Sequence, residues 1–117
     1  MLFRSLVEGQ LEGALHHGLG YALTEALLED PATGKTLNPS FADYRMATAM
    51  DMPTIDPLLV EVPDETGPFG AKGVGENGML VTAAAVANAI YDATGIRLRD
   101  LPITGEKIRE ALRAAKG

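Results

Sequence analysis

The chain has 117 residues, 46% of them hydrophobic, a formal net charge of −6 and no cysteine. This length suits one small domain, and the acidic balance without a basic stripe argues against nucleic acid or an acidic membrane surface as a partner. Without cysteine there is neither a disulfide framework nor a thiolate metal site. Because the chain shows neither an apolar run of about 18 residues nor the apolar core of a signal peptide, we expect a cytoplasmic protein.

The first segment predicts a long helix from Leu6 to Glu29, because its apolar residues recur at spacings of three and four. Each glycine inside a helix costs about 1 kcal/mol relative to alanine, so the glycines of this segment need a physical reason. A missing Cβ permits close helix packing, which we favour, or the close approach of a ligand. The glycines concerned are Gly9, Gly13, Gly18 and Gly20.

The middle of the chain predicts irregular structure with short extended pieces. Residues 30–35 have the composition of a turn, and prolines interrupt residues 36–53. The apolar run Leu58–Val62 lies between prolines and predicts a short strand. A second short strand is expected within Ile96–Ile103.

A glycine-rich loop at residues 67–78 leads into Met79–Thr94, which carries almost no charge before its end. A helix that is apolar nearly all round is normally buried, and Gly95 suits the position that ends it. Thr104 is then a candidate N-cap for an amphipathic C-terminal helix with Glu106 in its first turn. The expected fold is therefore α+β, a single domain over residues 1–117. Its parts are a long glycine-rich helix, short strands, the glycine-rich loop, a buried helix and an amphipathic C-terminal helix.

The loop carries the clearest chemical signal, and its residues alone leave two interpretations of Glu76. The pattern Gly73-x-Gly75-x-x-Gly78 matches a dinucleotide fingerprint, but that motif needs a strand directly before it. A loop that bares backbone N–H groups before a helix favours anions. Glu76 has two possible roles. Its carboxylate either interacts favourably with the helix dipole, the role that the residues alone favour, or lies against a cofactor.

Two further polar groups are interpreted as structural. His16 and His17 are adjacent on a helix and point about 100° apart, so they make a poor metal-binding pair, and we expect one half-buried and one exposed ring. Asp43, Tyr44 and Arg45 form a polar cluster that suits structural hydrogen bonds or ion pairs better than catalysis.

Several motifs in one order resemble the large, molybdenum-cofactor-binding subunit of the xanthine dehydrogenase/aldehyde oxidase family. Residues 7–23 are similar to the family's glycine-rich helix, and Asn38-Pro39 with Asp43-Tyr44-Arg45 to its central segment. Residues 67–76, GPFGAKGVGE, are close to its glutamate loop, and residues 87–95 and 101–104 to its closing helix and tail. The resemblance covers nearly the whole chain and places it in the C-terminal part of that subunit.

The resemblance implies a role for Glu76 and its neighbours. Family members hydroxylate an N-heterocycle, aldehyde or aromatic substrate with oxygen from water, using molybdenum on molybdopterin. Glu76 would be the catalytic base, taking a proton from a molybdenum-bound hydroxyl. The cofactor-binding residues implied are Gln10, Gly70, Ala71, Lys72, Gly73, Val74 and Gly75, and no side chain of this chain is implied as a metal ligand.

The resemblance also implies partners: the remainder of the molybdenum-binding subunit, and iron–sulfur and FAD domains or subunits that carry those cofactors elsewhere. Because full subunits are several times longer, we expect a fragment, a split-gene product or an excised domain that is inactive alone. The alternative is a non-catalytic remnant or interaction module that keeps the fold without cofactor. Two departures from the family are His17, where many members have glutamine, and Asn77-Gly78, where several have two prolines. Neither they nor the motifs identify the substrate.

Overall fold

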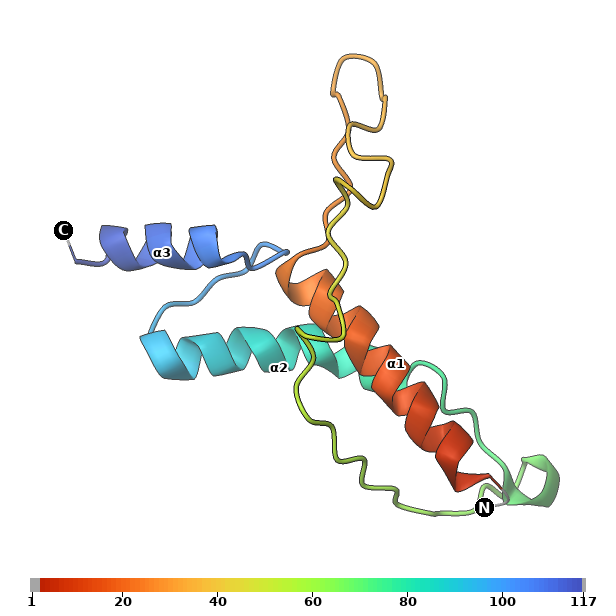
Figure 1. Ribbon diagram of the computed structural model, residues 1–117. Coiled ribbons are helices and arrows are strands. Elements are labelled where there is room, and N and C mark those ends of the chain that lie inside the picture. The colour runs from red at the N-terminus through yellow and green to blue at the C-terminus, as the bar shows by residue number, and fades with distance from the viewer. Residues whose placement is uncertain (1–2, 117) are drawn as a thin grey trace.

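The computed structural model describes residues 3–116, whose regular structure is helical (Figure 1). In chain order the elements are α1 (Arg4–Leu23), the single 3-10 turn η1 (Pro68–Gly70), α2 (Asn77–Thr94) and α3 (Gly105–Ala114). Figure 1 shows α2 crossing α1, while residues between them project far from both helices. None of the described helices is long and apolar enough to cross a membrane.

Helix α1 forms as predicted but ends at Leu23 rather than Glu29. The reason is the buried side chain of Asn38, which forms hydrogen bonds with backbone groups that a longer helix would use in its own hydrogen bonds. Its amide nitrogen donates to Ala26 O at 2.7 Å, and its Oδ1 accepts from the Leu28 N–H at 2.9 Å. The chain after Leu23 is therefore irregular, and Glu29 and Thr36 form an isolated antiparallel bridge in it.

The predicted strands are wrong for the described residues, so the β part of the α+β expectation is not found there. Residues Leu58–Val62 form no strand in the described part of the chain, and the side chains of Leu58 and Val60 are 89% and 78% exposed. Residues 96–103 are likewise irregular, although Ile103 is buried and its N–H donates to Ala22 O at 2.7 Å. A strand needs a ladder of hydrogen bonds to a neighbouring strand, and no such ladder forms within residues 3–116.

Helices α1 and α2 touch where side chains are small, which confirms close packing as the reason for one helical glycine of α1. A Cβ added to Gly18 would lie 2.5 Å from Thr82 Cβ, and one added to Gly78 would lie 3.1 Å from Ala14 Cβ. Gly9 and Gly13, in contrast, face open space within the described residues. The buried apolar residues are Ala14 and Ala22 of α1 and Ile103, whose N–H donates to Ala22 O.

The expectation that α2 is buried all round is wrong for this chain. Thr82 is its only residue buried within the described part, while Leu80 and Val81 are 68% and 64% exposed. Its predicted end is confirmed, because Gly95 adopts a left-handed φ of 73° and donates to Tyr91 O. Thr104 likewise caps α3, its hydroxyl oxygen accepting from Lys107 N.

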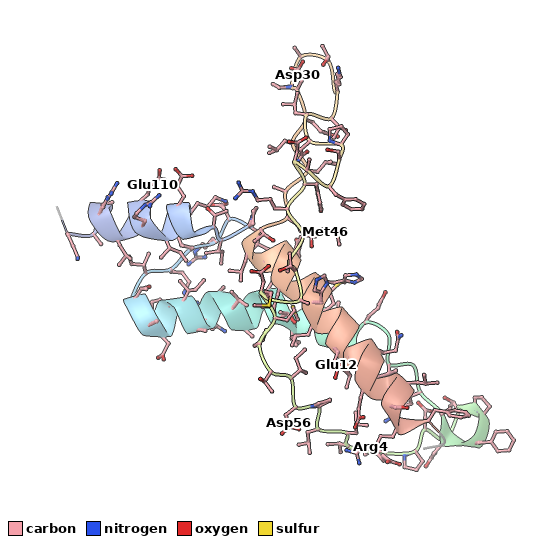
Figure 2. All side chains as sticks on the ribbon, in the orientation of Figure 1. Arg4, Glu12, Asp30, Met46, Asp56 and Glu110 are labelled. Carbon is pink, nitrogen blue, oxygen red and sulfur yellow. The ribbon has the colours of Figure 1, made fainter. Side chains whose placement is uncertain are left out.

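The described residues are spread widely for their number. Their radius of gyration is 18.1 Å, whereas a compact domain of this length has about 13 Å. Their accessible surface is 9081 Å², against about 6,100 Å² for a compact monomer of this mass. Side chains of the irregular segments accordingly project into open space (Figure 2).

Candidate functional site

The loop that leads to Glu76 begins with a tight turn built around Gly70. Gly70 has a φ of 78°, its N–H donates to Gly67 O, and its carbonyl accepts from Asp64 N at 3.1 Å. Ala71 N donates to Pro68 O at 3.0 Å. The backbone N–H groups of Gly70 and Ala71 are thus used inside the turn, and the glycine is required at position 70 by its left-handed backbone.

Beyond the turn, residues 72–76 present their backbone to the surroundings. None of their N–H groups donates to another backbone group of residues 3–116. A Cβ on Gly73 or Gly75 would meet no atom within 4 Å, so packing inside this chain does not require glycine at either position. Lys72 is exposed and Val74 half-buried. The segment is therefore a run of available donors with room for another group to approach.

Glu76 occupies the N-cap position of α2, and its side chain makes no capping hydrogen bond. Its carbonyl accepts from the N–H groups of Met79 and Leu80, at 3.1 and 3.2 Å, so its backbone belongs to the first turn of the helix. The side chain is exposed in this chain. A carboxylate on a fixed backbone, without a capping bond, is available to a group outside the chain.

The other sequence-predicted residue, Gln10, lies on α1 and is exposed. It precedes Leu11, whose carbonyl oxygen would lie 3.2 Å from a Cβ on Gly78. The structure therefore brings the backbone next to Gln10 against the first turn of α2, two residues after Glu76. Within the described residues, no group of three or more His, Cys, Asp or Glu side chains could hold a metal ion.

Asp64 and Lys72 are two charged residues that interact at the loop. Asp64 accepts hydrogen bonds from the Thr66 hydroxyl at 2.7 Å and the Thr66 N–H at 2.8 Å. These bonds lower the pKa of the Asp64 carboxyl below its ordinary value, and the positive charge of Lys72 acts in the same direction. Asp64 is therefore a fixed anion of the turn.

Among the polar residues interpreted as structural, His16, Asp43 and Tyr44 make hydrogen bonds within the described residues. His16 is half-buried and donates from Nε2 to Ala47 O at 2.9 Å, while His17 is exposed. The Tyr44 hydroxyl donates to Glu25 Oε2 at 2.8 Å, which raises the pKa of Tyr44. Glu25 could not be predicted as the partner of Tyr44, because nothing in its spacing links the two residues.

A cavity of about 630 Å³ lies between the end of α1 and the segment after residue 40. No residue of the glutamate loop lines it, so it is separate from the candidate site. The dinucleotide interpretation of the loop fails, because irregular chain and η1, rather than a strand, precede Gly73.

Known proteins similar to the chain agree on one family. A family described as molybdopterin cofactor-binding domain matches residues 2–53. The xanthine dehydrogenase molybdenum-binding subunit of Escherichia coli O157:H7 is 36% identical over 94% of this chain and 15% of its own length. The aldehyde oxidoreductase molybdenum-binding subunit PaoC of Escherichia coli K12 is 41% identical over 88% of this chain and 14% of its own length.

Solved structures agree with these relatives. Quinoline 2-oxidoreductase from Pseudomonas putida 86 superposes with a TM-score of 0.87 at 30% identity, over 97% of this chain and 15% of that chain. The chain therefore spans about one seventh of the length of the proteins it matches. Because sequence and fold agree over nearly all of its residues, the chain belongs to the family of molybdenum-cofactor-binding subunits of xanthine dehydrogenases and aldehyde oxidoreductases.

Proposed function

We propose that this chain acts as the C-terminal segment of a molybdenum-binding subunit and supplies the catalytic base and part of the cofactor pocket of a molybdenum hydroxylase. The substrates proposed are N-heterocycles, aldehydes or aromatic compounds. The observation that carries the proposal is the loop of residues 72–76, whose N–H groups donate to no other backbone group of residues 3–116. Glu76 lies at its end, on a helix packed against α1.

The residues present fit an anionic pterin cofactor. Consecutive backbone N–H groups next to a helix N-terminus bind anions, and the open space at Gly73 and Gly75 leaves room for a flat group to approach their backbone. Lys72 adds a positive charge at the same loop. No side-chain metal ligands are required, because in the family the pterin, rather than the protein, holds the molybdenum.

The proposed residues then have distinct roles. When bound, the molybdenum cofactor supplies the two-electron redox chemistry. The Glu76 carboxylate accepts a proton during oxygen transfer to the substrate, since its side chain is not engaged in capping. Lys72, Gly73, Val74 and Gly75 bind and orient the cofactor through their N–H groups. Gly70 and Ala71 shape the turn that presents them, and the Gln10 amide offers both a donor and an acceptor from α1.

The proposed partners follow from exposed surface. The accessible area exceeds that of a compact monomer by about 3,000 Å², and large apolar side chains such as Leu80, Val81 and Leu58 are exposed. The remainder of the molybdenum-binding subunit is proposed to cover these surfaces. Iron–sulfur and FAD domains or subunits are proposed to complete the electron path.

The decisive variant is Glu76→Gln in the enzyme assembled with the rest of its subunit. Glutamine keeps the volume but cannot accept a proton, so kcat should fall about a hundredfold to ten-thousandfold, with molybdenum content unchanged. The matched control is Glu106→Gln, which removes a glutamate from the first turn of α3 and should leave kcat unchanged. Near-normal turnover in Glu76→Gln, with a lowered unfolding midpoint, would show that Glu76 only stabilises the helix terminus.

A further inference from the structure

The contact between Thr82 of α2 and Gly18 of α1 lies on the helix that carries Glu76 at its N-terminus. Thr82 is 4% exposed and is the buried residue of α2. A Cβ at position 18 would lie within 3 Å of three Thr82 side-chain atoms, so the threonine side chain rests directly on the α1 backbone. No side chain intervenes at this point, and the separation of the two helices is fixed there by backbone and one threonine.

The same turn of α2 makes a second contact with α1. The Thr82 hydroxyl donates to Gly78 O at 2.5 Å, which holds its rotamer. A Cβ on Gly78 would lie 3.1 Å from Ala14 Cβ and 3.2 Å from Leu11 O. The helical turn from Gly78 to Thr82 therefore packs against α1 at both of its ends.

Glu76 moves with this turn because its carbonyl accepts the first hydrogen bonds of α2. Six residues of helix place Glu76 about 9 Å from Thr82 along the axis. A tilt of about 6° at Thr82 would therefore shift Glu76 by about 1 Å over this helical rise. A displacement of about 1 Å at a reacting group can cost about a hundredfold in rate.

We propose that Thr82 is a positioning residue for Glu76, acting through its close contact with Gly18. This inference rests on the proposed function of Glu76. The contact of Thr82 with Gly18 would then determine the position of the Glu76 carboxylate, in addition to holding α1 and α2 together.

The test is a glycine exchange between the two helices. Gly18→Ala should displace α2 and, in the assembled enzyme, lower kcat about tenfold to a hundredfold while KM and molybdenum content stay near normal. The exchange variant Gly18→Ala/Thr82→Gly removes the collision and keeps the number of helical glycines, so it should restore kcat to within about threefold of the unchanged enzyme. Gly105→Ala, where a Cβ meets open space, is the control.

Helix displacement is measured separately from turnover. The chain has no cysteine, so spin labels at Glu12→Cys and Asn77→Cys, both exposed, report the distance between α1 and the start of α2. Gly18→Ala should change this distance by about 1 Å, and the exchange variant should restore it. If Gly18→Ala fails to fold, Thr82→Gly alone, which leaves a void instead of a collision, should move the labels and lower kcat.

The outcomes separate the two proposals. A changed label distance with normal kcat, in an enzyme that Glu76→Gln inactivates, overturns the positioning role and leaves the proposed function intact. A fall in kcat without a distance change, or one explained by lost molybdenum, also overturns it. Normal turnover in both Glu76→Gln and Gly18→Ala, with a changed distance, rejects the proposed function of Glu76 itself.

Discussion

Phe69 has an unusual backbone for a bulky residue. Among the described residues it is the one non-glycine with a positive φ, 54°, and its side chain is fully exposed. A left-handed conformation costs an L-residue roughly 1–2 kcal/mol, and residues 3–116 provide no packing that offsets this cost. The turn at Pro68–Gly70, which begins the glutamate loop, therefore holds a strained aromatic residue at its tip.

Phe69→Gly should consequently leave the stability of this chain unchanged or raise it by up to about 1 kcal/mol. Relief of the left-handed penalty exceeds the added chain entropy of glycine, about 0.5–1 kcal/mol. Thermal unfolding of the two forms measures the difference. A loss of more than about 1 kcal/mol would show that the ring makes a stabilising contact here; Leu58→Gly, at an exposed residue without left-handed backbone, serves as the comparison.

Asp51 should give the 48–51 turn an acid-dependent stability. Its carboxylate accepts from the Thr48 N–H and hydroxyl at 2.8 and 2.7 Å, and these bonds lower its pKa below the ordinary 3.8. A lowered folded pKa means that the turn is stabilised above pH 3.8 and loses that stabilisation as pH falls through the lower, folded value. The Thr48 amide resonance should therefore titrate below pH 3.8 and cease to do so in Asp51→Asn, while Thr66, bonded to Asp64, continues to titrate in the variant.

At the scale of the element, α1 contains glycines in two different surroundings. Gly13 faces open space, whereas Gly18 lies against Thr82. Gly13→Ala should stabilise the chain by up to about 1 kcal/mol, because alanine is the better helix former. Gly18→Ala should destabilise it by about 1–3 kcal/mol, because the added carbon overpacks the crossing. Denaturant unfolding of both variants gives the comparison, and two changes of equal sign would contradict the packing of Gly18 against Thr82.

The helices were predictable where local chemistry decides them. Thr104 and Gly95 were identified as helix boundaries because capping depends on residues close in sequence. The end of α1 could not be predicted because Asn38 removes the backbone groups of Ala26 and Leu28 from the helix across twelve and ten residues. The strand predicted at Leu58–Val62 is wrong for a related reason: apolar composition predicts burial, whereas the side chains of Leu58 and Val60 are exposed within residues 3–116.

The candidate site was predictable in part. The sequence pattern singled out the loop and Glu76 but favoured a helix-dipole role for that residue, and the resemblance supplied both the proposed catalytic role and Gln10. The contact of Thr82 with Gly18 could not be found from spacing. The two residues lie in different elements far apart in the chain, and a threonine inside an apolar helix normally signals only packing. Helical periodicity indicates which residues share a face; it does not identify the residue opposite.

At the scale of the whole molecule, exposed apolar surface governs behaviour in isolation. The chain alone should bind no molybdenum cofactor, show no hydroxylase activity and self-associate despite its charge of −6, because Leu80, Val81 and other large apolar side chains are uncovered. Sedimentation at increasing concentration and binding of a dye specific for apolar surface measure the association, and metal analysis measures the cofactor. A clean monomer that retains stoichiometric molybdenum would contradict this.

The crossing of α1 and α2 also determines when this structure can form during synthesis. Gly18 and Thr82 are separated by more than 60 residues, so the first helix leaves the ribosome well before the helix that packs on it. At about 5–20 residues per second, this delay is roughly 3–13 s. During that interval α1 lacks its partner, and closure of the long intervening segment carries an entropic cost. Nascent chains should therefore depend on chaperones until α2 has been translated.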